Sequence, residues 1–309
     1  MLRPILLLLL IAAVPAAASA EERPLRLVTF NVLHGGPWSG FTGEDARLEA
    51  RLALIIEQLR TLDADVIALQ ESPVTRRRGD VAARIAGALG FHHVHARATE
   101  RVFPLRFLGW LITGVLGFVE GPAVLSRFPI VETQVHDLPR CRRRFDPRVA
   151  LRADVRTPAG VLAVFSTHTS RDDCQTRRVA EMAAKLGRAA VVMGDLNTVD
   201  SAPAFAAFRE HGFVDAFRAA NPEAAGATVW QRIHEPSSTV FRRVDYVLLR
   251  PGEGFTADFV AGRVVLNRPG RGDDGTVLWP SDHYGVLAEV RLTRRTVEPT
   301  AEVRRASDR

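Results

Sequence analysis

Short apolar runs recur along the chain and predict β-strands separated by helices or turns. The runs lie at Leu25–Phe30, Val66–Gln70, Ala123–Ser126, Val149–Val155, Val161–Thr167, Ala189–Met193, Val244–Leu249 and Val286–Arg291. Helical spacing of apolar residues predicts helices at Ala46–Leu59, Val81–Leu89, Arg177–Leu186 and Ala202–Glu210. Helix-separated strands come first and hairpin-like strands follow in the middle, so we expect a mixed α/β or α+β architecture.

Composition places the chain among ordinary globular proteins. It has 309 residues, of which 47% are hydrophobic and 25% charged, a balance that excludes a disordered, collagen-like or disulfide-dense chain. No internal repeat or long linker divides residues 21–293, which predicts one domain. The formal net charge of +6 favours encounters with anionic partners and says nothing about the fold.

The two ends of the chain are expected to lie outside this domain. Arg3, the apolar run Ile5–Val14 and the small residues before Glu21 predict a signal peptide over residues 1–20, cleaved near Ala20. The apolar run is too short to span a bilayer, so we expect a secreted or periplasmic protein. The charged, aperiodic residues 294–309 predict a disordered tail.

The sequence contains two cysteines, Cys141 and Cys174. An even pair in an oxidising compartment favours one disulfide. Two buried free thiols remain the alternative.

One apolar stretch fits neither a strand nor an ordinary core helix. Phe107–Val119 has thirteen residues without a charge and several glycines. One interpretation is a buried insertion. The other is a hydrophobic loop or short helix that contacts a membrane surface or an apolar substrate through Trp110 and Phe118.

Polar side chains stand repeatedly at the ends of the apolar runs, where α/β proteins assemble their sites. They are Asn31, Glu71, His168, Asp195, Asn197, Asp245, Asp282 and His283. Each alone is typical of a turn or cap, but the set in this order indicates a site for Mg²⁺ or Mn²⁺, because these ions prefer oxygen ligands. His34, His92, His93 and His95 are expected to be structural or surface residues.

Seven motifs in order resemble those of the endonuclease/exonuclease/phosphatase superfamily. They read TFNVLHG, IALQE, GPAVLSRFPI, FSTH, MGDLN, RVDYVLL and SDHYGV, and extend over nearly the whole chain after residue 20. The resemblance implies an α+β fold, a four-layer α/β sandwich in which two mainly antiparallel sheets pack face to face with helices outside. It also implies hydrolysis of a phosphoester by water with a divalent metal.

The resemblance implies a metal-binding group within the site. Glu71 would be the principal ligand of Mg²⁺, or of Mn²⁺ in its place. Asn31 would lie beside it, and Asp282 would supply a second carboxylate near the metal.

The resemblance assigns the remaining residues to catalysis. Asp195 would orient or deprotonate the attacking water, while Asn197 and His168 would contact the phosphate. His283 would stabilise the developing negative charge, and Asp245 would fix its tautomer and raise its pKa.

Several features bear on the substrate. The arginine clusters at 76–78 and 140–148 suit nucleic acid or are solvated surface, and Arg127 is a further candidate for substrate contact. The apolar stretch points instead to a phospholipid or sphingolipid head group, which we favour slightly over DNA. A non-enzymatic binding module is the third interpretation, and no obligate protein partner is expected.

Overall fold

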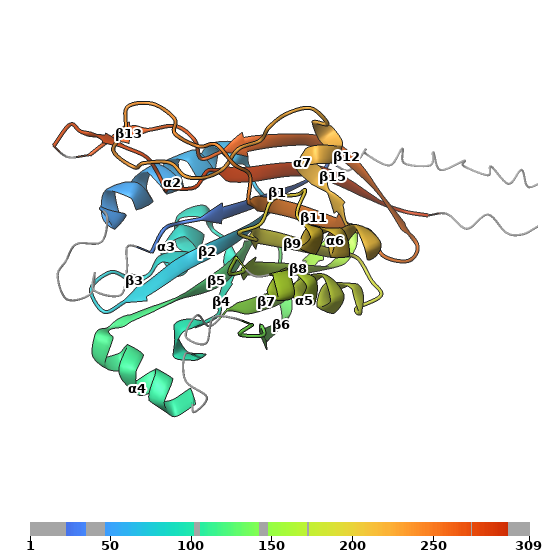
Figure 1. The fold of residues 1–309 in the computed structure, drawn as a ribbon, viewed down its shortest axis with the longest axis horizontal. Helices are drawn as coiled ribbons and strands as arrows, with labels where there is room; N and C mark the ends of the chain where they lie inside the picture. Colours follow the sequence, from blue (N-terminus) through green and yellow to red (C-terminus); the bar gives the residue numbers. More distant parts are fainter. Residues whose placement is uncertain are drawn as a thin grey trace, which may run out of the picture.

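Two β-sheets form the centre of the fold (Figure 1). The computed structural model describes residues 23–34, 47–101, 106–141, 148–171, 173–272 and 274–295. The first sheet has the order β12-β15-β1-β2-β5-β4, with β3 paired to β2; the second has the order β10-β11-β9-β8-β7-β6. All pairs are antiparallel except β1 with β2 and β8 with β9.

The strands of the first sheet are β1 (Leu25–Asn31), β2 (Val66–Thr75), β3 (Gly79–Asp80), β4 (His92–His95), β5 (Phe118–Ser126), β12 (Phe255–Val265) and β15 (Gly285–Arg294). Those of the second are β6 (Ile130–Asp137), β7 (Val149–Thr157), β8 (Gly160–His168), β9 (Ala190–Asp195), β10 (Val214–Asp215) and β11 (Asp245–Arg250). A separate small hairpin pairs β13 (Gly270–Arg271) with β14 (Val277–Leu278).

Three apolar cores give the molecule its four layers. The first lies between the sheets and contains Leu27 and Val124 facing Leu151 and Val191. The second joins the first sheet to α2 (Leu48–Leu62) and α3 (Val81–Leu89), and the third joins the second sheet to α5 (Asp173–Ala184), η2 (Pro203–Phe205) and α6 (Ala206–Glu210). The short helix α7 (Ala216–Ala220) packs mainly on β12. This arrangement confirms the expected four-layer sandwich.

All eight strands predicted from apolar runs are present, whereas two long strands went unpredicted. β6 is an edge strand whose residues are mostly exposed, and β12 is only half-buried along its length. Such strands need no continuous apolar run, because only one side of the strand, or neither, contacts the core. The predicted signal peptide, Arg142–Arg144 and the tail beyond Arg295 lie outside the described residues.

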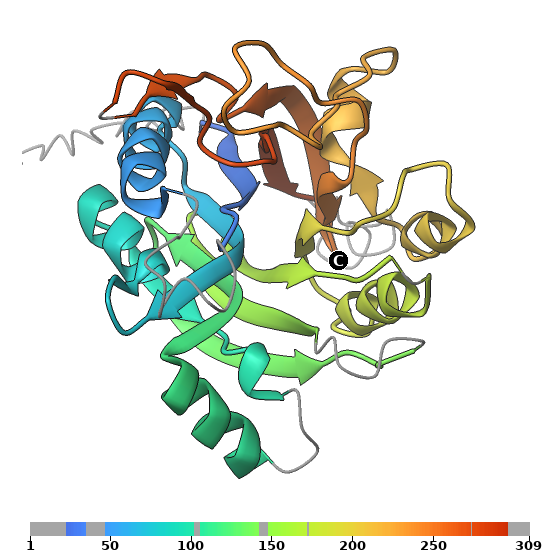
Figure 2. The same ribbon diagram turned by 60° about the vertical axis from the view of Figure 1, so that its left-hand side comes forward.

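The apolar stretch forms an exposed helix, which corrects the expectation of a buried insertion. Helix α4 (Arg106–Leu116) projects from the body of the fold in Figures 1 and 2 and packs on η1 (Thr99–Arg101). Its large side chains face solvent: Phe107, Trp110 and Val115 are 63%, 64% and 63% exposed. The buried positions are the small residues Gly109 and Thr113, and a Cβ at Gly109 would overlap the carbonyl group of Glu100.

Phe118 was expected to contact a membrane or substrate, and this prediction is wrong. Gly117 ends the helix with φ 63°, and the chain then enters β5. Phe118 is therefore the first residue of a core strand, is only 4% exposed, and packs edge-on against the ring of His34.

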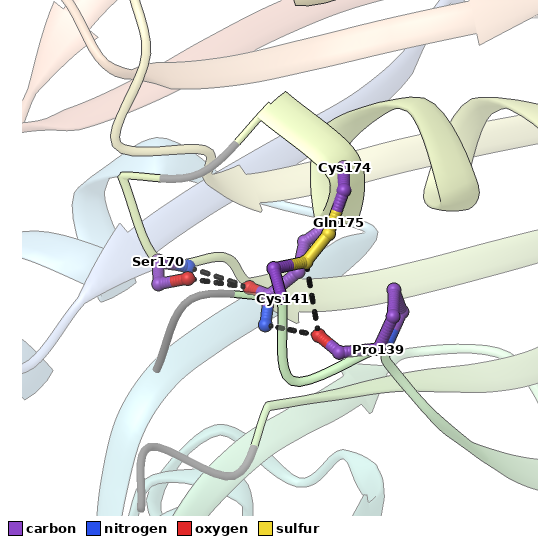
Figure 3. Close-up of a disulfide and its surroundings, with 5 residues drawn as sticks. All are labelled: Pro139, Cys141, Ser170, Cys174 and Gln175. Atoms are coloured by element: carbon purple, nitrogen blue, oxygen red, sulfur yellow. Dashed lines mark hydrogen bonds between the residues drawn. A yellow bond between two sulfur atoms is a disulfide. The ribbon is translucent and has the colours of Figure 1, made fainter. Parts of the chain in front are cut away.

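Cys141 and Cys174 form a disulfide with Cα atoms 6.5 Å apart (Figure 3). It ties the segment after β6 to the first turn of α5. Gln175 ties the same two segments together, since its amide donates to the Pro139 carbonyl and accepts from the backbone and hydroxyl of Ser170. The loop that follows β8 is thereby fixed at both ends.

Within the described residues, no helix is long and apolar enough to cross a membrane.

Candidate active site

Three adjacent strands of the second sheet bring acidic and imidazole side chains into one row. Asp195, the last residue of β9, pairs in register with His168 at the end of β8 and with Asp245 at the start of β11. Gly194 permits the close approach of β8 and β9, since a Cβ there would overlap the Thr167 carbonyl. The row is therefore a consequence of strand register.

The first sheet contributes Asn31 and Glu71, which lie at the same end of the sheet because β1 and β2 are parallel and Asn31 pairs with Gln70. A register shift in β2 between Leu69 and Ser72 places Glu71 in a bulge with φ 51°. A left-handed backbone at a non-glycine residue is costly and occurs preferentially at functional sites. The bulge separates Glu71 from the regular alternation of the strand.

The two halves of the site meet at Asp195. The amide of Asn31 donates from Nδ2 to Glu71 Oε1 at 3.1 Å and to Asp195 Oδ2 at 3.2 Å. The same Asp195 oxygen lies 3.3 Å from His168 Nε2 and 3.7 Å from His283 Nε2. Three nitrogen-bearing side chains from both sheets thus converge on one carboxylate oxygen, to which Asn31 donates a hydrogen bond.

His283 and Asp245 form a buried pair, with Nδ1 and Oδ2 3.0 Å apart. Burial opposes a charge on the imidazole, but the carboxylates of Asp245 and Asp195 outweigh it and raise the pKa of His283 to about 10. His283 is therefore a cation at neutral pH, and Nε2 faces Asp195.

The pKa of Asp195 lies close to neutral pH. Burial raises its pKa, His283 opposes the rise and Asp245 reinforces it, which brings the pKa to about 7. A carboxylate with such a pKa accepts a proton from water more readily than an ordinary aspartate does.

His168 and Asn197 stand beside this carboxylate. Asn197 adopts φ 49°, and its Nδ2 lies 2.9 Å from both His168 Nε2 and the Thr169 carbonyl oxygen. Burial first, and the charge of Arg148 second, hold the pKa of His168 well below its usual range. His168 is therefore neutral, and a bond from Asn197 requires that its Nε2 accept.

The side chains present fit a divalent cation. Burial raises the pKa of Glu71, but positive charge on the imidazoles of His168 and His34, when they are protonated, and a hydrogen bond from Asn31 hold it below its usual range. The carboxylate is therefore charged at neutral pH, where His168 itself is neutral. Asp282 lies near it, and burial, aided by the Glu71 charge, raises the pKa of Asp282. These oxygens form the hard donor set that Mg²⁺ and Mn²⁺ prefer. Atoms of Asp195, Asp245 and His283 also lie within 4.8 Å of one another and could hold an ion, although His283 and Asp245 are already bonded.

Two residues of the site were not predicted from the sequence. His34, expected to be structural or surface, places Nε2 3.4 Å from Glu71 Oε2, and its backbone N–H donates to the same oxygen. Arg51 is fully buried and donates to the carbonyls of Val32, Leu33 and Pro280. It thereby joins the loop after Asn31 to the loop before His283. In the sequence, the feature that could have identified Arg51 is its place on the apolar face of α2.

Arg127 was expected to contact substrate, and this prediction is wrong. Ser126 pairs with Val66, the first residue of β2, so Arg127 lies at the opposite end of the sheet from Glu71. There its guanidinium pairs with Asp63 and Asp65.

Comparison with known proteins settles the family. The profile of the Endonuclease/Exonuclease/phosphatase family matches residues 28–283. The chain belongs to this family. Its members are hydrolases that act on phosphoesters and typically depend on a divalent metal. No curated protein matches the sequence.

Solved structures of the family have the same fold. An endonuclease/exonuclease/phosphatase from Beutenbergia cavernae gives a TM-score of 0.62 at 24% identity, covering 90% of this chain and 74% of its own. A mannosyl-6-phosphatase from Bacteroides thetaiotaomicron gives 0.64 at 16% identity, covering 86% and 99%. The catalytic domain of human Nocturnin gives 0.61 at 17% identity, covering 88% and 94%. At these identities the likeness concerns the fold alone.

Proposed function

We propose that this chain hydrolyses a phosphodiester with the help of Mg²⁺ or Mn²⁺. The observation that carries the proposal is the convergence on Asp195 of Asn31, His168 and His283, with Glu71 charged beside them. A binding module would have no need to bury these groups together, because burying ionisable side chains is costly unless they are paired or functional.

Each side chain has a role that follows from its surroundings. Glu71, with Asn31 and Asp282 nearby, would hold the cation, which when bound polarises the phosphate and neutralises its charge. Asp195 takes the proton of the attacking water. His283, positioned by Asp245, stabilises the negative charge that develops on the phosphate oxygens. Asn197 and His168 orient the phosphate.

The first test uses a soluble substrate, bis(p-nitrophenyl) phosphate, with the purified protein after chelation. We expect no turnover until Mg²⁺ or Mn²⁺ is returned, and then release of p-nitrophenol. Absence of turnover with either ion, on this diester and on phosphomonoesters, contradicts the proposal and restores the binding-module interpretation.

We further propose that the substrate is a phospholipid, approached by α4 docking on the lipid surface. Helix α4 reverses the ordinary pattern of a surface helix, with small residues inside and Trp110, Phe107 and Val115 outside. Exposed apolar clusters of this kind mark interaction surfaces, and tryptophan suits the membrane interface.

The position and surroundings of α4 support this proposal. Phe118, directly after the helix, pairs with Thr75 of β2 and packs on His34, which contacts Glu71. The helix therefore emerges at the end of the sheet that carries the site. Arg76 donates to the Gly114 carbonyl, and Arg77 is exposed beside it, so basic charge accompanies the apolar face toward an anionic surface.

Sedimentation with anionic liposomes tests the docking. We expect the variant Phe107→Ser/Trp110→Ser/Val115→Ser to bind at least tenfold more weakly than the wild type, since each apolar side chain buried contributes about 1.5–3 kcal/mol. The matched control replaces exposed valines elsewhere, Val131→Ser/Val260→Ser, and should bind as the wild type does. Equal binding by all three proteins contradicts the docking.

Action on nucleic acid is the second candidate. It rests on the positive net charge and on the arginine clusters. Among the described arginines of these clusters, Arg78 pairs with the carboxylate of Glu49, whereas Arg76 and Arg140 donate to backbone carbonyls and keep their charge. Nicking of plasmid DNA at rates above those on liposomes would favour this candidate.

We also propose that the mature protein acts outside the cytoplasm. The disulfide between Cys141 and Cys174 supports this, since such bonds persist in oxidising compartments. Recovery of the mature chain, beginning near Glu21, from the periplasm or medium of an expressing bacterium tests it. Retention of residues 1–20 in the cytoplasm contradicts it.

A further inference from the structure

Two arginines meet on one tryptophan at the rim of the active site. The guanidinium carbon of Arg171 lies 4.8 Å from the centre of the Trp230 ring, and that of Arg242 lies 5.0 Å from it. Arg242 also lies 5.7 Å from the ring of Phe241. An arginine stacked on an aromatic ring loses rotational freedom, and the N–H groups in its plane stay available to other acceptors.

The backbone connects this group directly to the catalytic residues. Val229 bridges to Arg242 on one side and to His283 on the other, which separates the backbones of Arg242 and His283 by two strand spacings, about 10 Å. Arg171 lies in the loop after β8, in which the Thr169 carbonyl accepts from Asn197. The group therefore lies beside the site and is distinct from it.

These two cations lack a carboxylate partner among the residues that the structure describes. Nε and Nη2 of Arg242 are buried and make no hydrogen bond. Buried donors are normally satisfied, and a bound oxyanion is one way to satisfy this pair of N–H groups. Both guanidinium carbons lie within 5.0 Å of the Trp230 ring centre, so the two positive charges are within about 10 Å of each other, and a bound anion relieves their repulsion.

We propose that Arg171, Arg242 and Trp230 form a second anion subsite, which binds a phosphate in the lipid head group beside the phosphodiester that is hydrolysed. This rests on the proposed function, because it assigns the part of the substrate adjoining the scissile group. Arginine binds phosphate through paired N–H donors, and its charge disfavours a cationic head group such as choline. The subsite thus selects phospholipids whose head groups carry an additional phosphate.

Soluble head groups test the subsite without a membrane. The two substrates are glycerophosphoinositol and glycerophosphoinositol 4-phosphate, which differ by one phosphate. We expect the wild type to prefer the second at least tenfold in kcat/KM, since a charge-assisted hydrogen bond is among the strongest polar contacts. The variant Arg171→Gln/Arg242→Gln should lose that preference. The control Arg232→Gln, an exposed arginine of the same loop, should keep it.

Binding provides a readout that does not depend on turnover. Calorimetric titration with inositol 1,4-bisphosphate and inositol 1-phosphate should show the same tenfold preference in the wild type and its loss in the double variant. No preference in the wild type, or an equal one in both proteins, overturns the subsite. If the substitutions weaken binding of DNA but not of the bisphosphate, the lipid assignment is overturned.

The two proposals fail in different ways. A wild type that hydrolyses neither soluble diester but binds the bisphosphate through these arginines refutes the proposed activity and retains an anion site. A wild type that hydrolyses both equally retains the activity and refutes the subsite.

Discussion

The active site and helix α4 depart from ordinary protein packing in opposite directions. At the site, Asp195, Asp245 and His283 are ionisable and buried, and each lies within reach of a partner in the chain. On α4, Phe107 and Trp110 are apolar and exposed, and the chain buries only the small side of the helix.

This difference is the basis of our separate proposals for the two regions. Buried polar groups are tolerated when they satisfy one another, and most groups of the site do so, with His168 Nδ1 and Asp245 Oδ1 left unbonded among the described residues. An exposed apolar face is stabilised only by something that removes it from water. We therefore assign chemistry to the first region and surface recognition to the second.

The sharpest contrast lies within the apolar stretch itself. We expect Phe118→Ala to lower the free energy of unfolding by about 3–5 kcal/mol, because it leaves a cavity in the core. We expect Trp110→Ala to change it by about 0.5 kcal/mol or less, because the ring is mostly exposed. Urea unfolding followed by circular dichroism measures both, and similar losses in the two variants would mean that α4 belongs to the core.

Substitution of a catalytic residue in the active site should lower the catalytic rate. We expect His283→Ala to lower kcat about 10²–10³-fold, since it removes the cation that faces the developing charge. The control is His211→Ala, an exposed histidine after α6, which should retain full kcat. Steady-state kinetics on bis(p-nitrophenyl) phosphate decide, and near-normal kcat in His283→Ala would show that the site is assigned wrongly.

The disulfide joins the segment after β6 to the first turn of α5. We expect Cys141→Ser/Cys174→Ser to lower the free energy of unfolding by about 3 kcal/mol, because the bond closes a long loop in the unfolded chain. Reduction of the wild type should give the same loss, and no further loss in the variant. Unfolding curves that coincide with and without reductant in the wild type would contradict this.

Removing a single charge should change activity when the substitution is made in the active site. The described exposed residues of α4 are uncharged and allow no such test. We expect Glu71→Gln, which keeps the shape and removes the charge, to raise the Mg²⁺ concentration for half-maximal activity about tenfold or more. Activity measured against Mg²⁺ concentration tests this. An unchanged midpoint would move the cation away from Glu71, toward Asp195.

Most of the framework was predictable because its signals are local. The eight apolar runs became strands. The polar residues at their ends meet because β9 ends at Asp195 where the antiparallel β11 begins at Asp245, and His283 comes just before β15. Edge strands such as β6 were not predicted because few of their residues pack against the core, which leaves no continuous apolar run. The contact of His34 with Glu71 escaped as well, because it depends on the bulge in β2 and on the course of the loop after β1.

The two wrong assignments have equally physical causes. Phe118 was grouped with the apolar residues before it, although Gly117 separates a helix from a strand at that point. Arg127 directly follows β5. Because β5 runs antiparallel to β2, this position lies at the opposite end of the sheet from Glu71. Strand direction cannot be read from the apolar run alone.

The central claim, a metal-dependent site that a lipid-docking helix brings to its substrate, is tested most directly by one ratio. The rate on anionic phospholipid liposomes is divided by the rate on bis(p-nitrophenyl) phosphate, both with Mg²⁺, for the wild type and for Phe107→Ser/Trp110→Ser/Val115→Ser. The account predicts that the ratio falls at least tenfold in the variant, while His283→Ala loses both rates together. An unchanged ratio, or rapid cleavage of plasmid DNA with no action on liposomes, would contradict it.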